Sequence, residues 1–286
     1  MIRQEVGDYA ERSAESGDRF DQGRTLNNMG GVYYSLGQYQ QAEEFYQQAL
    51  KIAREIGNRA SEGRILNNLG LIYRQSGQYL QALESYQQAL MILEEVGDRS
   101  SISSTLNSLG TIYENLGQYE QALQSYQQAL SIAQEIDNRN NASNALDNLG
   151  GIYYSRGQYH QALELYQQAL AIKLKIGNRR GEANTLNNIG GVYERLGQYN
   201  QALETLQQAL TIQQEVGDIA GEANSLRGLG VVYESLEQYP QALEFYQQAL
   251  AITENIGDKS GVSKNLEQIG GIYTNLLFLR NSYMNG

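Results

Sequence analysis

The sequence predicts an all-α solenoid of helical hairpins, and three observations support this fold class. A phrase of about 40 residues recurs six times, and a seventh copy stops halfway. Within each copy, apolar residues fall at spacings of three and four, which places them on two helical stripes with a glycine between them. A period between 20 and 50 residues indicates one unit stacked on itself. We therefore expect one solenoid domain whose function depends on an extended surface.

The repeat boundaries follow from a short linker of the form Gly-Asp-Arg or Gly-Asn-Arg. Its glycine suits the end of one helix, and its Asp or Asn suits the cap of the next. The linker glycines are Gly17, Gly57, Gly97, Gly177, Gly217 and Gly257, with Asp137 in the third repeat. They divide the chain into an imperfect N-terminal cap or truncated repeat at 1–17, full repeats at 18–57, 58–97, 98–137, 138–177, 178–217 and 218–257, and a C-terminal half repeat or capping helix at 258–286.

Within one repeat, the first helix carries a Leu-Gly or Ile-Gly pair followed by tyrosine, and the second carries alanines and a central aromatic residue. Gly77 and its counterparts suit the turn between the two helices. The chain has 22 tyrosines, and because most recur at fixed places in the repeat we interpret them as packing residues. The glycines of the apolar pairs, from Gly30 to Gly270, are expected to let the helices approach closely.

Composition excludes several classes of function. The formal net charge is -11, there is no cysteine, and His160 is the one histidine. An acidic chain without a basic cluster does not suit nucleic acid, and no cysteine means no disulfide or thiolate metal site. No apolar run approaches the roughly 18 residues of a membrane span. We expect a soluble, cytoplasmic protein without metal or cofactor.

The sequence also lacks a recognisable catalytic constellation. His160 occupies a position that varies from repeat to repeat, and no glycine-rich phosphate loop with its lysine occurs. Adjacent acidic pairs such as Glu94 and Glu95 would point to different faces of a helix, so they form no acid/base pair. We therefore predict that the protein is not an enzyme and has no catalytic residues.

At the C-terminal end, Leu276, Leu277, Phe278 and Leu279 replace the expected turn. We expect the last helix to continue through them. Four apolar residues in a row are unusual for the polar outer face of a terminal repeat. These residues would pack back as a cap, dock a neighbouring domain, or join two chains into a homo-oligomer.

The recurring pattern of Leu, Gly and Tyr, then Gly and Tyr at the turn, then Ala, an aromatic and Ala resembles the tetratricopeptide repeat (TPR) family over about residues 18 to 275. The 40-residue period is similar to the variety found in the Pins/LGN scaffold family and in bacterial TPR arrays beside CHAT domains. The resemblance implies a TPR α-solenoid, a right-handed superhelix whose first helices line a concave groove. It also implies that the groove holds a peptide or a partner protein.

Short polar residues recur where the groove is expected. Asparagine has both a donor and an acceptor, so a ladder of asparagines suits the main chain of an extended peptide. The peptide-binding candidates are Arg24, Asn27, Arg64, Asn67, Arg74, Asn107, Asn144, Asp147, Asn184, Asn187, Asn224 and Arg227. Alternatively, the asparagines merely bond within their own helices.

Three arginines, Arg24, Arg64 and Arg74, make the first two repeats of the expected groove basic. Guanidinium groups pair carboxylates bidentately, so we expect a peptide partner with acidic residues at one end. The linker arginines, such as Arg59, are instead expected to pair locally with acidic residues on neighbouring helices.

Three hypotheses of function remain open at this stage. The leading one is a non-enzymatic scaffold for protein–protein interaction that binds an extended peptide in its groove. The second is a self-assembling structural module, favoured by near-identical repeats and the apolar C-terminal end. The third is a sensor or recruitment segment of a larger effector protein, for example a CHAT-type protease.

Overall fold

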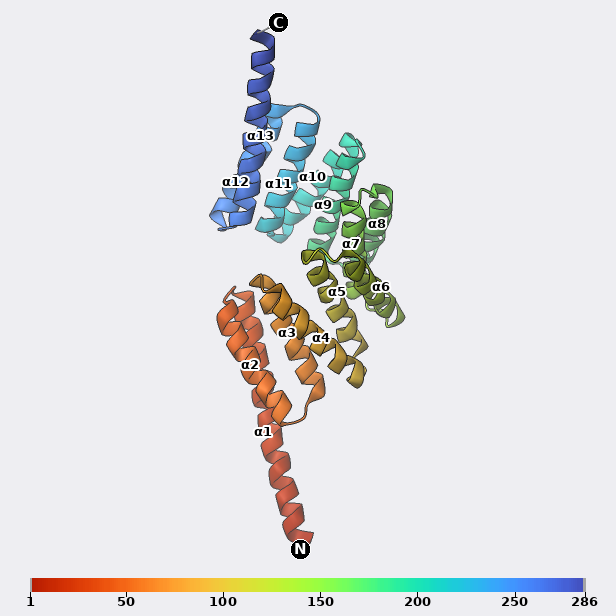
Figure 1. The fold of residues 1–286 in the computed structure, drawn as a ribbon, viewed down its shortest axis with the longest axis vertical. Coiled ribbons are helices and arrows are strands. Elements are labelled where there is room, and N and C mark those ends of the chain that lie inside the picture. The colour runs from red at the N-terminus through yellow and green to blue at the C-terminus, as the bar shows by residue number, and fades with distance from the viewer. Residues whose placement is uncertain (1, 285–286) are drawn as a thin grey trace. The chain divides into compact units, whose positions relative to one another are not determined.

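The computed structural model describes residues 2–284 of the chain, and the side chains of residues 18–276. Helices account for all the regular structure in this part of the chain (Figure 1). In chain order they are α1 (Ile2–Ser35), α2 (Tyr39–Glu55), α3 (Arg59–Gln75), α4 (Tyr79–Val96), α5 (Arg99–Asn115), α6 (Tyr119–Glu135), α7 (Arg139–Ser155), α8 (Tyr159–Ile176), α9 (Arg179–Arg195), α10 (Tyr199–Val216), α11 (Ile219–Ser235), α12 (Tyr239–Asn255) and α13 (Lys259–Met284).

The chain divides into two compact units, Met1–Asn148 and Leu149–Gly286, and α7 contributes residues to both. In unit 1, α1 packs on α2, α3 on α4, and α5 on α6 as helical hairpins (Figure 1). In unit 2, α9 packs on α10 and α11 on α12. Within unit 1, α2 contacts α3 and α4 contacts α5, and the first helices α3 and α5 touch. Within unit 2, α8 contacts α9, α10 contacts α11, α12 contacts α13, and the first helices α9 and α11 touch. This confirms the predicted all-α fold of stacked hairpins.

The helix ends follow the predicted linker chemistry. Gly57 and Gly97 have φ values of 68° and 71°, the left-handed conformation that ends a helix without a steric penalty. Asp137 adopts the same conformation at φ 52°, as its place in the third linker predicts. Asn58 Oδ1 then accepts a hydrogen bond from the backbone N–H of Ser61 at 3.0 Å, which caps α3.

The first predicted linker behaves differently, because α1 runs through Gly17 without a break. The prediction of a helix end at Gly17 is therefore wrong. A single glycine costs a helix interior about 1 kcal/mol and does not by itself end it. The division of the chain at residue 17 stays a prediction, since the side chains of residues 1–17 lie outside the described residues.

At the other end, α13 runs to Met284, which confirms the expected extension of the last helix through the missing turn. The side chain of Leu276 is 37% exposed. The side chains of Leu277, Phe278 and Leu279 lie outside the described residues. Self-association through this end therefore stays a prediction.

The core of five hairpins contains a tyrosine ring that packs on a glycine of the facing helix, and Leu206 takes this place in the hairpin of α9 and α10. A methyl group at Gly110 would lie 2.4 Å from Tyr126 Cε1, and one at Gly70 would lie 2.7 Å from Tyr86 Cε1. No side chain larger than hydrogen fits at such a contact, which confirms the predicted close approach. Gly270 is an exception, because no heavy atom lies within 4 Å of a methyl group placed there. Among the described residues, no side chain takes the place at Gly270 that a tyrosine ring takes at Gly70 and Gly110.

The linker arginines Arg59 and Arg179 pair with glutamates near the end of the second helix of their own hairpin, in line with the predicted local pairing. Arg59 Nη2 lies 2.5 Å from Glu95 Oε2, and Arg179 Nη2 lies 2.7 Å from Glu215 Oε2. Arg139 departs from this pattern and pairs with Asp137 at 3.3 Å. These exposed pairs each contribute little to stability.

Glu62 of α3 forms a partly buried ion cluster with Arg54 of α2 and Arg59 of α3. The Glu62 carboxylate is 6% exposed and accepts from Arg54 Nε at 2.9 Å and from Arg59 Nη1 at 2.7 Å. Burial alone would raise the pKa of Glu62, but the hydrogen bonds from the two arginines outweigh it and hold the pKa below its usual value. A carboxylate with a lowered pKa in the folded state stabilises the fold above its unfolded pKa, and this contribution is lost as the pH falls.

We expect Glu62→Gln to lower the stability of unit 1 by about 1 to 2 kcal/mol at pH 7, because it weakens two hydrogen bonds to a charged acceptor. The difference from the parent should shrink as the pH falls below the unfolded-state pKa of a glutamate, about 4.3, and on through the lower folded-state pKa of Glu62. Urea denaturation midpoints at pH 7 and pH 3 test this. Glu222→Gln is the matched control, since the carboxylate of Glu222 accepts from the neutral amide of Gln214 at 2.9 Å. Equal effects of the two variants at pH 7 would contradict the assignment.

Candidate functional site on the first helices

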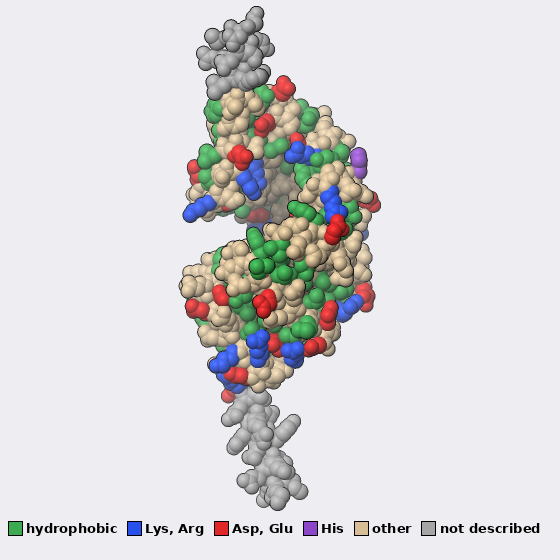
Figure 2. Space-filling view, in the orientation of Figure 1, with side chains coloured by type: hydrophobic (Ala, Val, Ile, Leu, Met, Phe, Trp, Pro, Cys, Tyr) green, Lys and Arg blue, Asp and Glu red, His purple; other side chains and the backbone are tan. Residues whose placement is uncertain are grey.

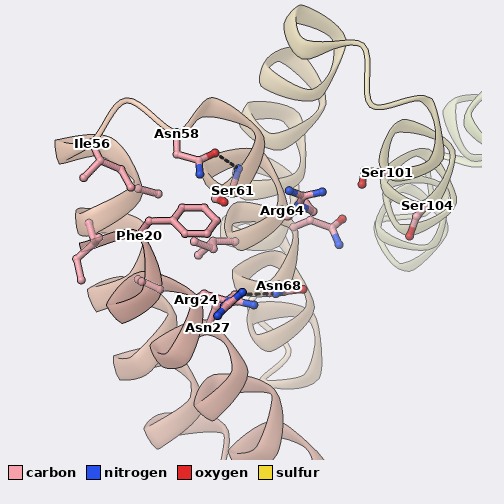
Figure 3. Close-up of a pocket in the computed structure, with 16 residues that line it drawn as sticks. Phe20, Arg24, Asn27, Ile56, Asn58, Ser61, Arg64, Asn68, Ser101 and Ser104 are labelled. Atoms are coloured by element: carbon pink, nitrogen blue, oxygen red, sulfur yellow. Dashed lines mark hydrogen bonds between the residues drawn. The ribbon is translucent and has the colours of Figure 1, made fainter. Parts of the chain in front are cut away.

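In unit 1, four predicted groove residues line one cavity of about 390 Å³, called cavity A. Arg24 and Asn27 come from α1, and Arg64 and Asn67 come from α3 (Figure 3). Figure 3 shows that Ser101 and Ser104 of α5 and the apolar side chains of Phe20 and Ile56 complete its lining, with Phe20 and Ile56 on the side of α2. Cavity A therefore offers a polar side formed by first helices and an apolar side.

The predicted asparagines are joined to the next first helix rather than to their own. Asn27 Oδ1 accepts from Asn68 Nδ2 at 3.1 Å, and Asn67 Oδ1 accepts from Thr105 Oγ1 at 3.0 Å. In unit 2, Asn187 Oδ1 accepts from Ser225 Oγ at 2.7 Å. The alternative expectation, a ladder bonded within single helices, is wrong for these three residues because their partners lie one repeat further on.

Each of these three bonds uses the amide oxygen, which leaves the Nδ2 group of the asparagine to donate elsewhere. Asn27, Asn67 and Asn187 are all partly exposed, so solvent or a ligand can reach them. Asn107 is arranged in another way, since its Nδ2 donates to the backbone oxygen of Asn141 at 3.4 Å and its Oδ1 is buried. The predicted ladder thus contains two kinds of asparagine.

The three arginines predicted to read acidic side chains do not share one cavity. Arg24 and Arg64 line cavity A, where Arg24 Nη2 lies 3.0 Å from Asp21 Oδ1 and Arg64 Nη1 lies 3.4 Å from Asp98 Oδ2. Arg74 instead lines a second cavity of unit 1, of about 280 Å³ and called cavity B. Cavity B also contains the predicted residues Asn107, Asn144 and Asp147.

In unit 2, the remaining predicted residues come together in one cavity of about 570 Å³, called cavity C. Asn184 and Asn187 of α9 line it, as do Asn224 and Arg227 of α11. Arg227 Nη2 donates to Asn224 Oδ1 at 2.7 Å, and burial lowers the pKa of the Arg227 guanidinium. The structure gives Arg227 no carboxylate within ion-pair distance in residues 18–276.

Several lining residues were not predicted from the sequence. Phe20 of cavity A lies close to the poorly repeating N-terminal segment, which hid its place in the repeat. Leu206 and Gly228 of cavity C are departures from the repeat at positions that elsewhere hold tyrosine and polar residues. Leu206 and Gly228 could have been found as breaks in the repeat pattern. The asparagine ladder was predicted from positions where the pattern holds, so it did not include them.

The described residues show little that would support catalysis. His160 is exposed at the start of α8. No group of three or more His, Cys, Asp or Glu side chains that could hold a metal ion occurs in residues 18–276. Burial raises the pKa of Tyr86 to about 12, so its phenol stays protonated at neutral pH.

On the face shown in Figure 2, acidic and basic side chains lie next to one another, without a continuous basic patch. Among the described helices, none combines the length and the apolar character needed to cross a membrane.

Comparison with known families decides the class of this repeat. The sequence profile of the tetratricopeptide repeat matches residues 21–95, 101–175 and 181–255. The chain belongs to the tetratricopeptide repeat family. This confirms the resemblance inferred from the Leu-Gly-Tyr and Ala-aromatic-Ala pattern.

Solved TPR-like structures share the fold at low sequence identity. BtubC from P. vanneervenii is 19% identical, with a TM-score of 0.65 over 77% of this chain and 92% of BtubC. The Rap protein complexed with Competence and Sporulation Factor is 15% identical, with a TM-score of 0.66 over 90% of this chain and 76% of that protein. A putative kinesin light chain of Podosopora anserina with nearly identical TPR-like repeats is 23% identical, with a TM-score of 0.55 over 68% and 96%. No curated protein matches the chain significantly.

Proposed function

We propose that this TPR chain is a non-enzymatic scaffold for protein–protein interaction, which binds an extended peptide segment along its first helices. The observation that carries the proposal is the arrangement of Asn27, Asn67 and Asn187. Each is fixed through its amide oxygen by the neighbouring first helix, and each keeps its Nδ2 donor for another acceptor. The Rap protein, which has the same fold, is known in complex with Competence and Sporulation Factor, and this supports a binding role.

The binding mode follows from the chemistry of the donors. An extended peptide presents backbone carbonyl groups at regular intervals, and asparagine Nδ2 groups donate to them whatever the peptide side chains are. Because the amide oxygens are already held by neighbouring residues, the side chains are pre-oriented and lose less entropy on binding. The main chain of the partner thus supplies affinity, and the surrounding side chains supply selectivity.

Selectivity for acidic residues would come from cavity A. Arg24 and Arg64 line it together, and among the described residues each pairs with one carboxylate, that of Asp21 and that of Asp98 respectively. A guanidinium group has five donors, so each arginine keeps donors for a carboxylate of the peptide. Arg74 would read an acidic residue further along, in cavity B.

To test this selectivity, peptides would be selected from a displayed random library on the immobilised chain. We expect them to be rich in Asp and Glu, and Arg24→Gln with Arg64→Gln to weaken their binding about 10- to 100-fold, since each charged pair at a partly exposed site contributes about 0.5 to 1.5 kcal/mol. Affinity measured by fluorescence anisotropy at low and high salt reports the loss. Lys51→Gln with Lys175→Gln makes the same change in net charge at exposed sites outside cavity A. An equal loss in this control would show a general charge effect and contradict the proposal.

Self-assembly and recruitment within a larger effector, the two other hypotheses, make predictions that differ from those of a peptide-binding scaffold. Self-assembly through the C-terminal end predicts a mass that grows with concentration in light scattering, whereas a peptide receptor needs no such growth. A role as the recruitment segment of a larger effector is compatible with the same groove and depends on what else the reading frame encodes. A cytoplasmic location stays a prediction from the sequence.

A further inference from the structure

Cavity C lies where the repeat loses one of its packing tyrosines. Five repeats place a tyrosine in the middle of the second helix, against the glycine of the facing first helix, and the fifth repeat places Leu206 there. Leu206 is 2% exposed, and a methyl group at Gly190 would lie 2.6 Å from Leu206 Cγ. The leucine therefore fills the inner part of the site but brings no aromatic ring and no hydroxyl group.

In the third and sixth repeats, the tyrosine hydroxyl donates a hydrogen bond to an acidic residue near the end of the first helix. Tyr126 Oη donates to Glu114 Oε2 at 3.1 Å, and Tyr246 Oη donates to Glu234 Oε2 at 2.7 Å. Glu194 is the residue at the same position in the fifth repeat. With Leu206 in place of tyrosine, the fifth repeat brings no phenol to Glu194 from this position.

The side chain of Glu194 is 12% exposed and only partly satisfied by its neighbours. Its Oε1 accepts from Ser235 Oγ at 2.8 Å, and its Oε2 lies 3.4 Å from Arg195 Nε. A carboxylate can accept about four hydrogen bonds, so both oxygens retain capacity. Glu194 lines cavity C together with Leu206.

A second loss of volume occurs at the position that faces the missing ring. In the sixth repeat, Tyr246 Oη lies 3.5 Å from Oε1 of Gln268 on the next first helix. Gly228 occupies the repeat position equivalent to Gln268, and it faces Leu206 as Gln268 faces Tyr246. The first five repeats carry Asn or Ser at this position. A methyl group at Gly228 would lie 2.9 Å from Leu206 Cδ2, so the two positions are in contact. The two smallest residues of the series thus meet at cavity C.

We propose that cavity C receives a tyrosine side chain of the bound peptide, in place of the tyrosine that the fifth repeat lacks. Its ring would lie on Leu206, Gly228 and Val231, and its hydroxyl group would donate to Glu194. The same chain shows in its third and sixth repeats that a tyrosine hydroxyl bonds to an acidic residue at this position. The inference rests on the proposed function, because the tyrosine comes from the bound peptide.

The surroundings of Glu194 select a neutral phenol over related groups. A phosphorylated tyrosine or a carboxylate would bring a second negative charge next to Glu194, and like charges at this distance repel. A phenylalanine would fill the same apolar surface but would leave the acceptors of Glu194 without a new donor. A phenol satisfies both the apolar wall and the carboxylate.

The test uses 4-methylphenol, which is the tyrosine side chain itself, as the probe. Its binding to the full chain would be followed by saturation-transfer NMR and by shifts of backbone amide signals around cavity C. We expect the parent to bind 4-methylphenol and to bind toluene more weakly. Glu194→Gln should reduce the preference for the phenol about three- to ten-fold, because a neutral acceptor makes a weaker hydrogen bond.

A variant that fills cavity C with a larger side chain of the protein itself tests the inference most directly. Leu206→Tyr restores the residue that the other repeats carry, and we expect it to fold and to abolish binding of 4-methylphenol. Leu206→Met conserves volume and should retain binding. If Leu206→Tyr does not fold, the double variant with Gly228→Asn restores both repeat residues and takes its place. Unchanged binding of 4-methylphenol in the folded tyrosine variant, or no binding to the parent up to the solubility of the probe, would overturn the inference.

The two proposals fail in different ways. Changing Asn27 and Asn67, which line cavity A and not cavity C, should weaken peptide binding while 4-methylphenol still binds cavity C. If selected peptides bind through the asparagines but 4-methylphenol does not bind, only the tyrosine inference is overturned. If 4-methylphenol binds as expected but no peptide depends on the asparagines, the proposed function is overturned.

Discussion

Gly110→Ala is expected to lower the stability of unit 1 by about 1 to 3 kcal/mol, whereas Gly270→Ala is expected to raise stability by about 0.5 to 1 kcal/mol. The two glycines occupy the same place in the repeat, each after a Leu or Ile on a first helix. At Gly110 the added methyl group would lie 2.4 Å from the ring of Tyr126, and at Gly270 it would meet no heavy atom within 4 Å. The opposite signs arise because helix propensity favours alanine at both sites, but only Gly110 is in contact with a ring.

Urea denaturation midpoints of the parent and the two variants measure this difference. A third variant, Gly110→Ala with Tyr126→Ala, removes the ring that the methyl group meets. We expect its stability loss to be smaller than the sum of the two single losses, because the clash has gone. Destabilisation of similar size by Gly270→Ala would show that the glycine serves some need other than contact with the tyrosine.

The second large effect concerns binding. Changing Asn27, Asn67 and Asn187 together to aspartate is expected to weaken binding of a selected peptide by at least about ten-fold and up to about 1000-fold. Each lost hydrogen bond contributes about 0.5 to 1.5 kcal/mol, and the new negative charge repels acidic peptides. Aspartate is nearly isosteric with asparagine and keeps the acceptor oxygen that holds Asn68, Thr105 and Ser225 in place.

The aspartate variant therefore separates binding from folding better than alanine does. An alanine at position 67 would leave the hydroxyl of the buried Thr105 without its acceptor. The charge-matched control changes Gln48, Gln128 and Gln208, which are exposed on second helices, to glutamate. Helicity measured by circular dichroism should be equal in all three proteins. A similar loss of affinity in the control would attribute the effect to net charge.

Much of the fold could be predicted from the sequence because residues with the same structural role recur at the same position in each repeat. The spacing around Gly70 predicts a close helix contact, and the ring of Tyr86 occupies it. The Asn of the linker predicts a helix cap, and Asn58 forms one. The helix end predicted at Gly17 is wrong, because a single glycine costs a helix interior about 1 kcal/mol and does not by itself end it.

The candidate site was less predictable. Sequence spacing places Asn27 and Asn67 on the same side of their helices, but it does not show that their oxygens are taken by the next repeat. Arg74 was grouped with Arg24 and Arg64 on sequence grounds, and the structure assigns it to a different cavity because it lies on the last turn of α3. Cavity C arises from two exceptions, Leu206 and Gly228, that meet only in three dimensions.

The central claim is that asparagine Nδ2 groups of the first helices donate to a bound peptide. The most direct test is a titration of asparagine-selectively ¹⁵N-labelled protein with a selected acidic peptide, in which the side-chain amide signals are observed. We predict that the signals of Asn27 and Asn67 shift on binding, while those of the helix caps Asn138 and Asn178 stay in place. Peptide binding that leaves the Asn27 and Asn67 signals unchanged would contradict the account.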